Sequence, residues 1–508
     1  MTRAFPRPAA VLTTLVVMLA SLLTAASAVP AHAAAGSALR LPTASASGDS
    51  DGDVVGDATM YMRRLALTRD TMSGAARKQA DASLARPRLA DERITCSASA
   101  PICVHYATSG SDAPKQGGDI TPDLVLNTLV DIYRFYQSSG YRMPEADHTT
   151  GGGTVQTNGQ PVPADDIDIY LANIGKQGYY GYCAPEPLTG SAARHTPAFC
   201  VLDNDYAEFP HGTPTTNLQV TAAHEFFHAV QFAYDATEDS WFMESTAVWM
   251  EDQVFDNIND NIQYLPYGPL GKPTLSLDKA TTFGVYGGWI FFRWVTEQRP
   301  QLVGRLPGII LSMWQRAAAG SRDRYSLQAV QGALKAAKLP LRTAFARFAA
   351  ANRDATHTYT EGAANHYPIA APTGSFRLRS LVHRSGTVRI NHLAAATERF
   401  VPKGHRLGSK RTKLRLHLNM ADTSRGTAAM VTVFERNGKT DVRPVRLNRH
   451  GGGFIAVPFS SRRIKRVELT MTNASTRMRC WIGGIFSCQG QPKDMHQLER
   501  FSAAVRRA

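Results

Sequence analysis

After its N-terminal stretch, the 508-residue sequence contains no apolar run that approaches the ~20 residues needed to cross a bilayer. It has no C-x-x-C pair, which argues against a zinc site built from cysteines. Its basic C-terminal region has no ordered basic-aromatic motif and no zinc-finger spacing, so we expect no nucleic-acid partner. With 43% hydrophobic and 19% charged residues, the composition is that of a globular protein.

The N-terminus has the features of an export signal. Arg3 and Arg7 precede an apolar core, and small residues lead to a cleavage site after Ala33, with Ala28 as an alternative. We therefore expect residues 1–33 to be a signal peptide and the mature protein to be secreted, either extracellular or associated with the cell wall. An uncleaved membrane anchor is the competing interpretation.

The six cysteines agree with export, because disulfides persist in oxidising compartments. Six cysteines allow fifteen pairings, but here they fall into three close pairs along the chain. We predict the disulfides Cys96–Cys103, Cys183–Cys200 and Cys480–Cys488.

The net charge is distributed unevenly. It is −15 over residues 95–300 and +20 over residues 373–508, and this step indicates a domain boundary near residue 370. The segment 34–93 begins as a flexible linker and then acquires helical spacing, which fits either a pro-segment or a plain N-terminal helix. We predict a linker and possible pro-segment (34–93), a catalytic domain (94–370) and a basic accessory domain (371–508).

Apolar periodicity predicts an α+β chain. We expect strands at 102–108, 167–174 and 199–205, and helices at 123–141, 217–235, 241–255 and within 285–350. After residue 373, short alternating segments separated by glycine-containing turns predict an antiparallel β-sandwich-like domain.

The segment TAAHEFFHAVQFAYD places two histidines four residues apart in an apolar helix. His224 and His228 then lie on one face, about 5–6 Å apart at Cβ, and can bind one zinc ion. Glu225 is rotated by about 100° from His224, where it can reach the reacting water rather than the metal. The H-E-x-x-H pattern therefore predicts a zinc site with Glu225 as the general base.

A catalytic zinc site needs a third protein ligand and an open position. The metzincin continuation is absent, because Gln231 stands where that pattern has glycine. The following segment, WFMESTAVWMED, offers Glu244 as the third ligand. Glu251 or Asp252 on the same segment can then orient an imidazole of the site.

This pair of helices resembles the gluzincin type of zinc peptidase, to which thermolysin belongs. The segments QVTAAHEFFHAVQFAYD, WFMESTAVWMED and YGGWIFFRWVTE resemble more closely a family of secreted bacterial zinc metalloproteases. Upstream, CVHYATSGSDAP, DIDIYLANI and VLDNDY also match its pattern, so that the resemblance covers roughly residues 96–300. It implies a zincin-like catalytic domain with a mixed sheet and active-site helices.

The resemblance implies a role for each matching residue. His224 and His228 correspond to the paired zinc ligands, Glu225 to the catalytic base and Glu244 to the third ligand. The sequence departs from the thermolysin pattern E-x-x-x-D, because Val248 occupies the position of the aspartate. The role of that aspartate is therefore unassigned.

Two further site predictions concern the oxyanion and a second metal. A gluzincin often uses a downstream tyrosine or histidine as oxyanion donor, and Tyr286 in FGVYGGW is our candidate. Its competitors are Tyr234, Tyr264 and Tyr267. In the VLDND segment, which we expect to line the cleft with its free edge, Asp203 and Asp205 either bind Ca²⁺ or cap a turn.

Together these features predict a secreted zinc-dependent endopeptidase. One alternative is a non-catalytic cell-wall or surface-binding protein on a zincin scaffold, and another is a zinc amidase that acts on a cell-wall cross-link. The expected partners are a protein or peptide substrate and, for the basic domain, an anionic cell-wall polymer or acidic glycan. Merely solvated charges are the simpler interpretation of that basic domain.

Overall fold

The computed structural model describes residues 58–147, 155–163, 165–186, 194–281, 283–320, 324–404, 407–409 and 411–507. The predicted signal peptide lies outside the described residues, as does the first part of the 34–93 segment. No helix in these ranges is both long and apolar enough to span a membrane.

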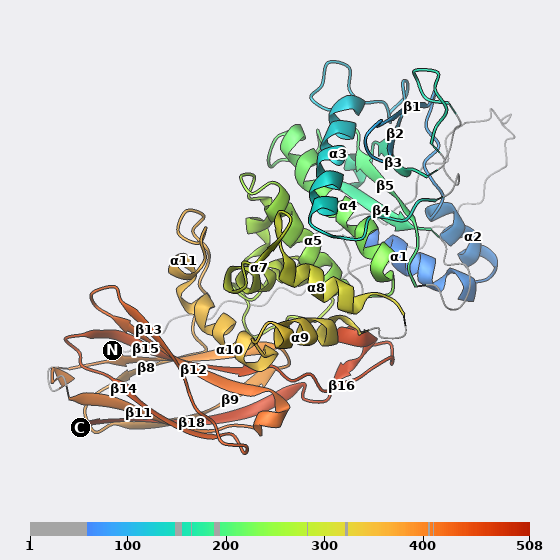
Figure 1. Cartoon of the computed structure of the whole chain (residues 1–508). Coiled ribbons are helices and arrows are strands. Elements are labelled where there is room, and N and C mark those ends of the chain that lie inside the picture. The colour runs from blue at the N-terminus through green and yellow to red at the C-terminus, as the bar shows by residue number, and fades with distance from the viewer. Residues whose placement is uncertain are drawn as a thin grey trace, which may run out of the picture. The chain divides into compact units, whose positions relative to one another are not determined.

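The N-terminal region is a mixed sheet with helices packed on it (Figure 1). The strand order is β1-β2-β3-β5-β4, in which β2, β3 and β5 are parallel and the two outer strands are antiparallel to their neighbours. Its strands are β1 (Arg93–Cys96), β2 (Ile102–Tyr106), β3 (Ile167–Ala172), β4 (Gly181–Pro185) and β5 (Ala198–Asp203). Its helices are α1 (Ala58–Thr68), α2 (Gly74–Ser83), α3 (Pro122–Ser138), α4 (Pro214–Asp235) and α5 (Ser240–Val254).

A helical region follows and joins the same hydrophobic core. It contains α6 (Gly284–Gly287), α7 (Trp289–Gln298), α8 (Gly308–Ala317), α9 (Ser326–Ala336), α10 (Leu341–Ala351) and α11 (Ala355–Thr358), with a short hairpin of β6 (Leu302–Val303) and β7 (Leu306–Pro307). The prediction of helices within 285–350 is confirmed, and the described chain is an α+β protein with β-rich C-terminal sheets.

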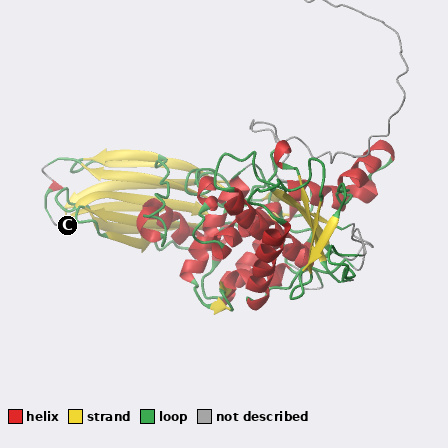
Figure 2. Cartoon of the chain, turned by 90° about the horizontal axis from the view of Figure 1, so that it is seen from above, coloured by secondary structure: helices red, strands yellow, loops and turns green. Residues whose placement is uncertain are grey.

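The C-terminal region contains two large sheets, whose strands Figure 2 shows in yellow. Their orders are β13-β12-β15-β10-β8 and β14-β11-β18-β9. The bounds are β8 (Gly374–Leu378), β9 (His383–Asn391), β10 (Ala394–Pro402), β11 (Thr412–Asn419), β12 (Thr427–Glu435), β13 (Thr440–Pro444), β14 (Gly452–Pro458), β15 (Ile464–Asn473) and β18 (His496–Arg507), with a small pair of β16 (Met478–Arg479) and β17 (Gln491–Pro492).

Alternate residues of both large sheets share one apolar core, which includes Leu414, Val431, Leu469 and Phe501. The expectation of a purely antiparallel arrangement is wrong at one strand, because β8 runs parallel to β10. The boundary near residue 370 stays a prediction, since the described residues from 58 to 507 form one compact unit by their contacts.

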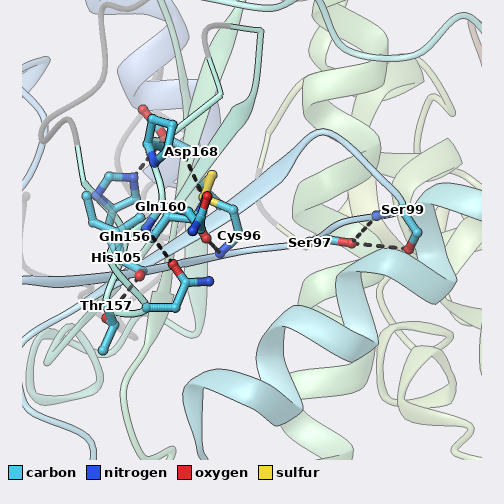
Figure 3. Close-up of a disulfide and its surroundings, with 12 residues drawn as sticks. Cys96, Ser97, Ser99, His105, Gln156, Thr157, Gln160 and Asp168 are labelled. Carbon is cyan, nitrogen blue, oxygen red and sulfur yellow. Dashed lines mark hydrogen bonds and ion pairs between the residues drawn. A yellow bond between two sulfur atoms is a disulfide. The ribbon is translucent and has the colours of Figure 1, made fainter.

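All three predicted disulfides are present: Cys96–Cys103, Cys183–Cys200 and Cys480–Cys488. The first joins directly paired residues of β1 and β2, and the second joins directly paired residues of β4 and β5. Figure 3 shows Cys96, whose backbone N–H donates to Gln156 Oε1 at 3.2 Å, and nearby His105, which contacts Asp168 at 2.8 Å. Three disulfides are typical of a protein that folds in an oxidising environment.

The sheet order corrects one expectation about the cleft. We expected the strand before the catalytic helix, β5, to offer its free edge, but β5 lies between β3 and β4. The edge belongs to β4, which the sequence did not predict because its segment GYCAP shows no alternation and is buried on both faces. Asp203 N donates to Tyr180 O, and Glu186 N donates to Pro197 O. Hydrogen-bonded pairs alternate along an antiparallel ladder, so Cys183 occupies a non-hydrogen-bonded position and its N–H points away from β5.

Candidate metal centre

Helix α4, which contains the H-E-x-x-H pattern, lies in the hydrophobic core. Thr213 and Thr216 form a capping box at its start, and Pro214 occupies the first turn, where a missing N–H costs nothing. Residues on every face of the helix are buried, which explains its apolar sequence all round. An imidazole in such a helix must find a polar partner, because burying it without one costs free energy.

His224, His228 and Glu244 form one buried group that could hold a metal ion. The two Nε2 atoms lie 3.0 Å apart, and the Glu244 carboxylate oxygens lie 3.2 Å from His224 Nε2 and 3.3 Å from His228 Nε2. Ligands placed tetrahedrally at 2.0–2.1 Å from one zinc ion would be about 3.3 Å apart. The three side chains therefore fit a tetrahedral zinc site.

The second nitrogen of each histidine has its own partner. His224 Nδ1 lies 2.5 Å from Glu251 Oε1, and His228 Nδ1 lies 2.7 Å from Gln231 Oε1. The amide of Gln231 is fixed in turn, because its Nε2 donates to Met243 O at 2.9 Å. Such partners fix the orientation of ligating imidazoles in metal sites.

These contacts decide between the two acids predicted to orient an imidazole, and they identify Gln231 as a further residue of the site. Of the two acids considered for orienting an imidazole, Glu251 contacts His224, whereas Asp252 binds Arg293 and accepts from Asn261. Sequence reasoning noted Gln231 only as a departure from the metzincin pattern. Its position three residues after His228 was the available signal for the contact it makes.

The electrostatics of the group favour a cation. Burial lowers the pKa of His224, but hydrogen bonds with Glu244 and Glu251 outweigh it, and the pKa lies well above its ordinary value. Burial raises the pKa of Glu251 to about 7, against the opposing effect of His224. The carboxylates thus retain a proton on the imidazole, which a bound metal ion would displace.

Exposure differs sharply among the proposed ligands. The side chains of His228 and Glu244 are fully buried, whereas that of His224 is 11% exposed. The Tyr286 ring stacks on the His224 ring, with the ring centroids 6.1 Å apart. Tyr264 stacks on Tyr286 at 5.0 Å, and burial raises its pKa well above the ordinary value.

The other tyrosine candidates lie elsewhere. The Tyr234 hydroxyl accepts a hydrogen bond from Arg142 N at 2.8 Å, and its ring packs against Trp314. Tyr267 is 42% exposed and contacts Phe283. The structure thus brings Tyr286 and Tyr264 to the metal group.

Glu225 faces the edge of the sheet and the N-terminal helix. The Thr59 hydroxyl of α1 donates to Glu225 Oε2 at 2.7 Å and accepts from Cys183 N at 2.9 Å. The Thr59 hydroxyl is therefore hydrogen-bonded both to the outward N–H of the edge strand β4 and to the carboxylate of the expected general base. Arg63, one turn further along α1, is buried and donates to Ala236 O at 2.7 Å.

The start of α5, the helix that carries Glu244, is held by the C-terminal region. Asp239, its N-cap residue, accepts hydrogen bonds from Cys488 N at 2.7 Å and Gln489 N at 3.3 Å. Burial raises the pKa of Asp239 to about 6. The disulfide loop 480–488 thus contacts the first turn of the helix that carries Glu244.

At the suggested calcium site, Asp203 caps a turn. Its Oδ1 accepts from Gly175 N at 2.5 Å and its Oδ2 from Tyr206 N at 2.6 Å. Asp203, Asp205 and Glu208 are close enough to share a cation, but acidic groups of this kind are common without one. Of the two interpretations of Asp203, calcium binding and turn capping, the contacts of its carboxylate correspond to turn capping.

Comparisons with known proteins add no function. No family model matches the chain, and no curated protein matches it. Among solved structures, the Yersinia pseudotuberculosis-derived mitogen (10% identity, TM-score 0.16) covers 25% of this chain and 87% of its own. The pre-peptidase C-terminal domain of a Bacillus anthracis collagenase (7% identity, TM-score 0.16) covers 27% and 98%. A GH115 4-O-methyl-alpha-glucuronidase (9% identity, TM-score 0.14) covers 57% and 42%, and with TM-scores this low none of the three carries an argument.

Proposed function

We propose that the chain is a secreted zinc-dependent endopeptidase with a zincin-like catalytic domain. The observation that carries the proposal is the close approach of His224, His228 and Glu244, at distances that suit one tetrahedral zinc ion. The resemblance of the two helices to gluzincins and the three disulfides support the same reading.

Zinc bound at these three side chains would polarise the scissile carbonyl and acidify water. In the proposed reaction, Glu225 accepts the proton of the attacking water and passes it to the leaving amine. Tyr286, beside His224, donates a hydrogen bond to the oxyanion that develops on the substrate carbonyl. Glu251 and Gln231 hold the two imidazoles in place for metal binding.

Metal analysis combined with a casein assay tests this proposal. We expect about one zinc per wild-type chain and hydrolysis that a chelator abolishes. His228→Ala should lose both the metal and the activity, because a site with two ligands binds zinc far more weakly. His357→Ala, a change at an exposed histidine, is the matched control. A metal-free, chelator-indifferent wild-type protein would reject the proposal.

The two alternatives make different predictions in the same assay. A wall-binding protein on this scaffold would hold zinc and hydrolyse neither casein nor murein. A zinc amidase would cleave a murein cross-link in preference to casein. A panel of both substrates therefore separates the three functions once metal binding is established.

We also propose that α1 belongs to an inhibitory pro-segment. A peptide that pairs with the edge of β4 would need the N–H of Cys183, which Thr59 occupies, and would have to pass the Glu225 carboxylate that Thr59 contacts. The link that follows α1 is exposed around residues 70–76, so a protease can reach it.

A cleavable link tests the pro-segment. Residues 70–76 are replaced by the recognition sequence of a site-specific protease, and casein hydrolysis is measured before and after cutting. We expect at least a roughly tenfold increase, because cutting lets α1 leave the edge of β4. Wild-type protein treated with the same protease is the control. Unchanged or lower activity, with α1 shown to have dissociated and zinc retained, would make α1 a structural helix.

A further inference from the structure

One face of the β14-β11-β18-β9 sheet lies against the shared core, and the opposite face, here called the outer face, is turned away from it. The register places Lys413 opposite Arg506, and Arg415 opposite Ala504. Arg500 pairs with Thr387, and Arg389 with Leu498. Alternation along each strand puts all these residues on the same side, opposite to core residues such as Leu414 and Val505.

The outer face is positively charged and carries no acid. Its five cations are Lys413, Arg415, Arg500, Arg506 and Arg389. The structure describes the outward positions of all four strands, and none of them is Asp or Glu. None of the five cations forms an ion pair with a described residue. Lys413 and Arg506 lie directly opposite each other, an arrangement that destabilises a sheet unless an anion neutralises it.

The other large sheet differs in this respect. Its buried Glu468 binds Arg353, Arg399 and Arg466, and Arg443 binds Asp441. Helix α10 packs on β12 and β15 of that sheet. Several cations on that sheet or packed against it are therefore neutralised by carboxylates, whereas the five cations of the outer face are not.

Several of the other side chains on the outer face are short and polar. Thr387 and Ser385 on β9 are exposed, and Asn419 on β11 is exposed beside Arg500. The Phe454 ring is 50% exposed and packs at 4.7 Å against the ring of His417. Hydroxyl and amide groups of this kind exchange hydrogen bonds with sugar hydroxyls, while the cations attract carboxylates.

We propose that the outer face of the β14-β11-β18-β9 sheet binds an acidic polysaccharide. The five cations lie on three of its strands in two groups. Lys413, Arg415 and Arg506 are about 5–7 Å apart in one group, and Arg500 and Arg389 form the other, about four residues or ~13 Å further along the sheet. Two separate groups of cations on one face suit a polymer that carries anions along its length. This binding is independent of the proposed peptidase activity and places the protein on an acidic glycan surface.

Other polyanions fit the face less well. Single-stranded nucleic acid binds through several aromatic stacking platforms, whereas Phe454 is the one aromatic side chain exposed on the outer face and it already packs on His417. A membrane surface would require apolar side chains that insert among the lipids, and Leu498 is the one large aliphatic side chain exposed there.

Binding of the full-length protein to polygalacturonate tests the proposal. Affinity is measured by calorimetry from 20 to 300 mM salt for the wild type and for the triple variant Arg415→Gln, Arg500→Gln, Arg506→Gln. We expect the variant to bind at least about tenfold more weakly at low salt, and with a smaller salt dependence, because it forms fewer contacts with the anions.

A second triple variant removes the same charge elsewhere. Lys439→Gln, Arg462→Gln and Lys465→Gln change exposed cations associated with the other sheet, and should weaken binding less than about twofold. Equal losses in both variants would mean that net charge alone drives binding and would overturn the proposal. Absence of wild-type binding, or tighter binding of duplex DNA or anionic lipid vesicles that depends on the same three arginines, would also overturn it. Thermal melts of both variants establish that they are folded.

Discussion

Replacing Glu225 with glutamine is expected to lower the rate of peptide hydrolysis roughly 10²- to 10⁴-fold while the protein keeps about one zinc per chain. Glutamine has nearly the shape of glutamate but cannot accept the proton of the attacking water. It can still accept the hydrogen bond that Thr59 donates at 2.7 Å, so the position of α1 should not change. The measurements are metal content and single-turnover cleavage of a fluorogenic peptide.

The matched control is Glu208→Gln, a change at an exposed glutamate on the loop between β5 and α4. It should keep wild-type activity and metal. If Glu225→Gln retains full activity with its metal in place, Glu225 is not the base. If it loses the metal as well, the defect lies in folding of the site, and circular dichroism would show it.

Replacing Glu468 with glutamine is expected to destabilise the protein by about 3–5 kcal/mol. Glu468 is fully buried, and its carboxylate contacts Arg353 at 2.8 Å, Arg399 at 2.8 Å and Arg466 at 3.0 Å. Arg353 is itself buried, so the variant leaves a positive charge without its carboxylate partner in the interior. Denaturant unfolding at neutral pH measures the effect.

The dependence on pH has a defined sign. Burial raises the pKa of Glu468, but the three arginines outweigh burial, so that the pKa lies below its ordinary value. A carboxylate whose pKa is lowered by folding stabilises the fold at pH values above its ordinary pKa. That stabilisation is lost as the pH falls through the pKa of the folded state. The difference between wild type and Glu468→Gln should therefore shrink below about pH 4.5.

The exposed pair Arg443–Asp441 provides the contrast. Its side chains are 45% and 33% exposed, so Arg443→Gln should cost less than about 1 kcal/mol. A loss for Glu468→Gln no larger than that of Arg443→Gln would show that the buried cluster does not hold the C-terminal sheets to the helical region.

The parts of the site that could be predicted are those with a local signature. His224 and His228 are four residues apart on one helix, and Glu244 lies on the next helix, so spacing alone suggested the group that the structure brings together. The three disulfides were equally accessible, because the paired cysteines are close in sequence. In each case the chemistry and the short separation restrict the alternatives.

The parts that escaped prediction depend on contacts between distant segments. Thr59 meets Glu225 across 166 residues, and no periodicity near either residue records that contact. The position of β4 outside β5 depends on strand order, which sequence patterns do not encode. The parallel strand β8 escaped for the same reason, since alternation shows that a strand has two faces but not the direction of its neighbour.

The contact of Asp239 with the loop that Cys480 and Cys488 close has a consequence for how this protein can be divided. A fragment cut at residue 370 would lose the backbone donors at Cys488 and Gln489, and Asp239 would keep Ser326 as a hydrogen-bond donor at the buried first turn of α5. The two halves are therefore not interchangeable modules: in evolution or in engineering, the segment that bears Glu244 must travel together with the distant loop that supports it.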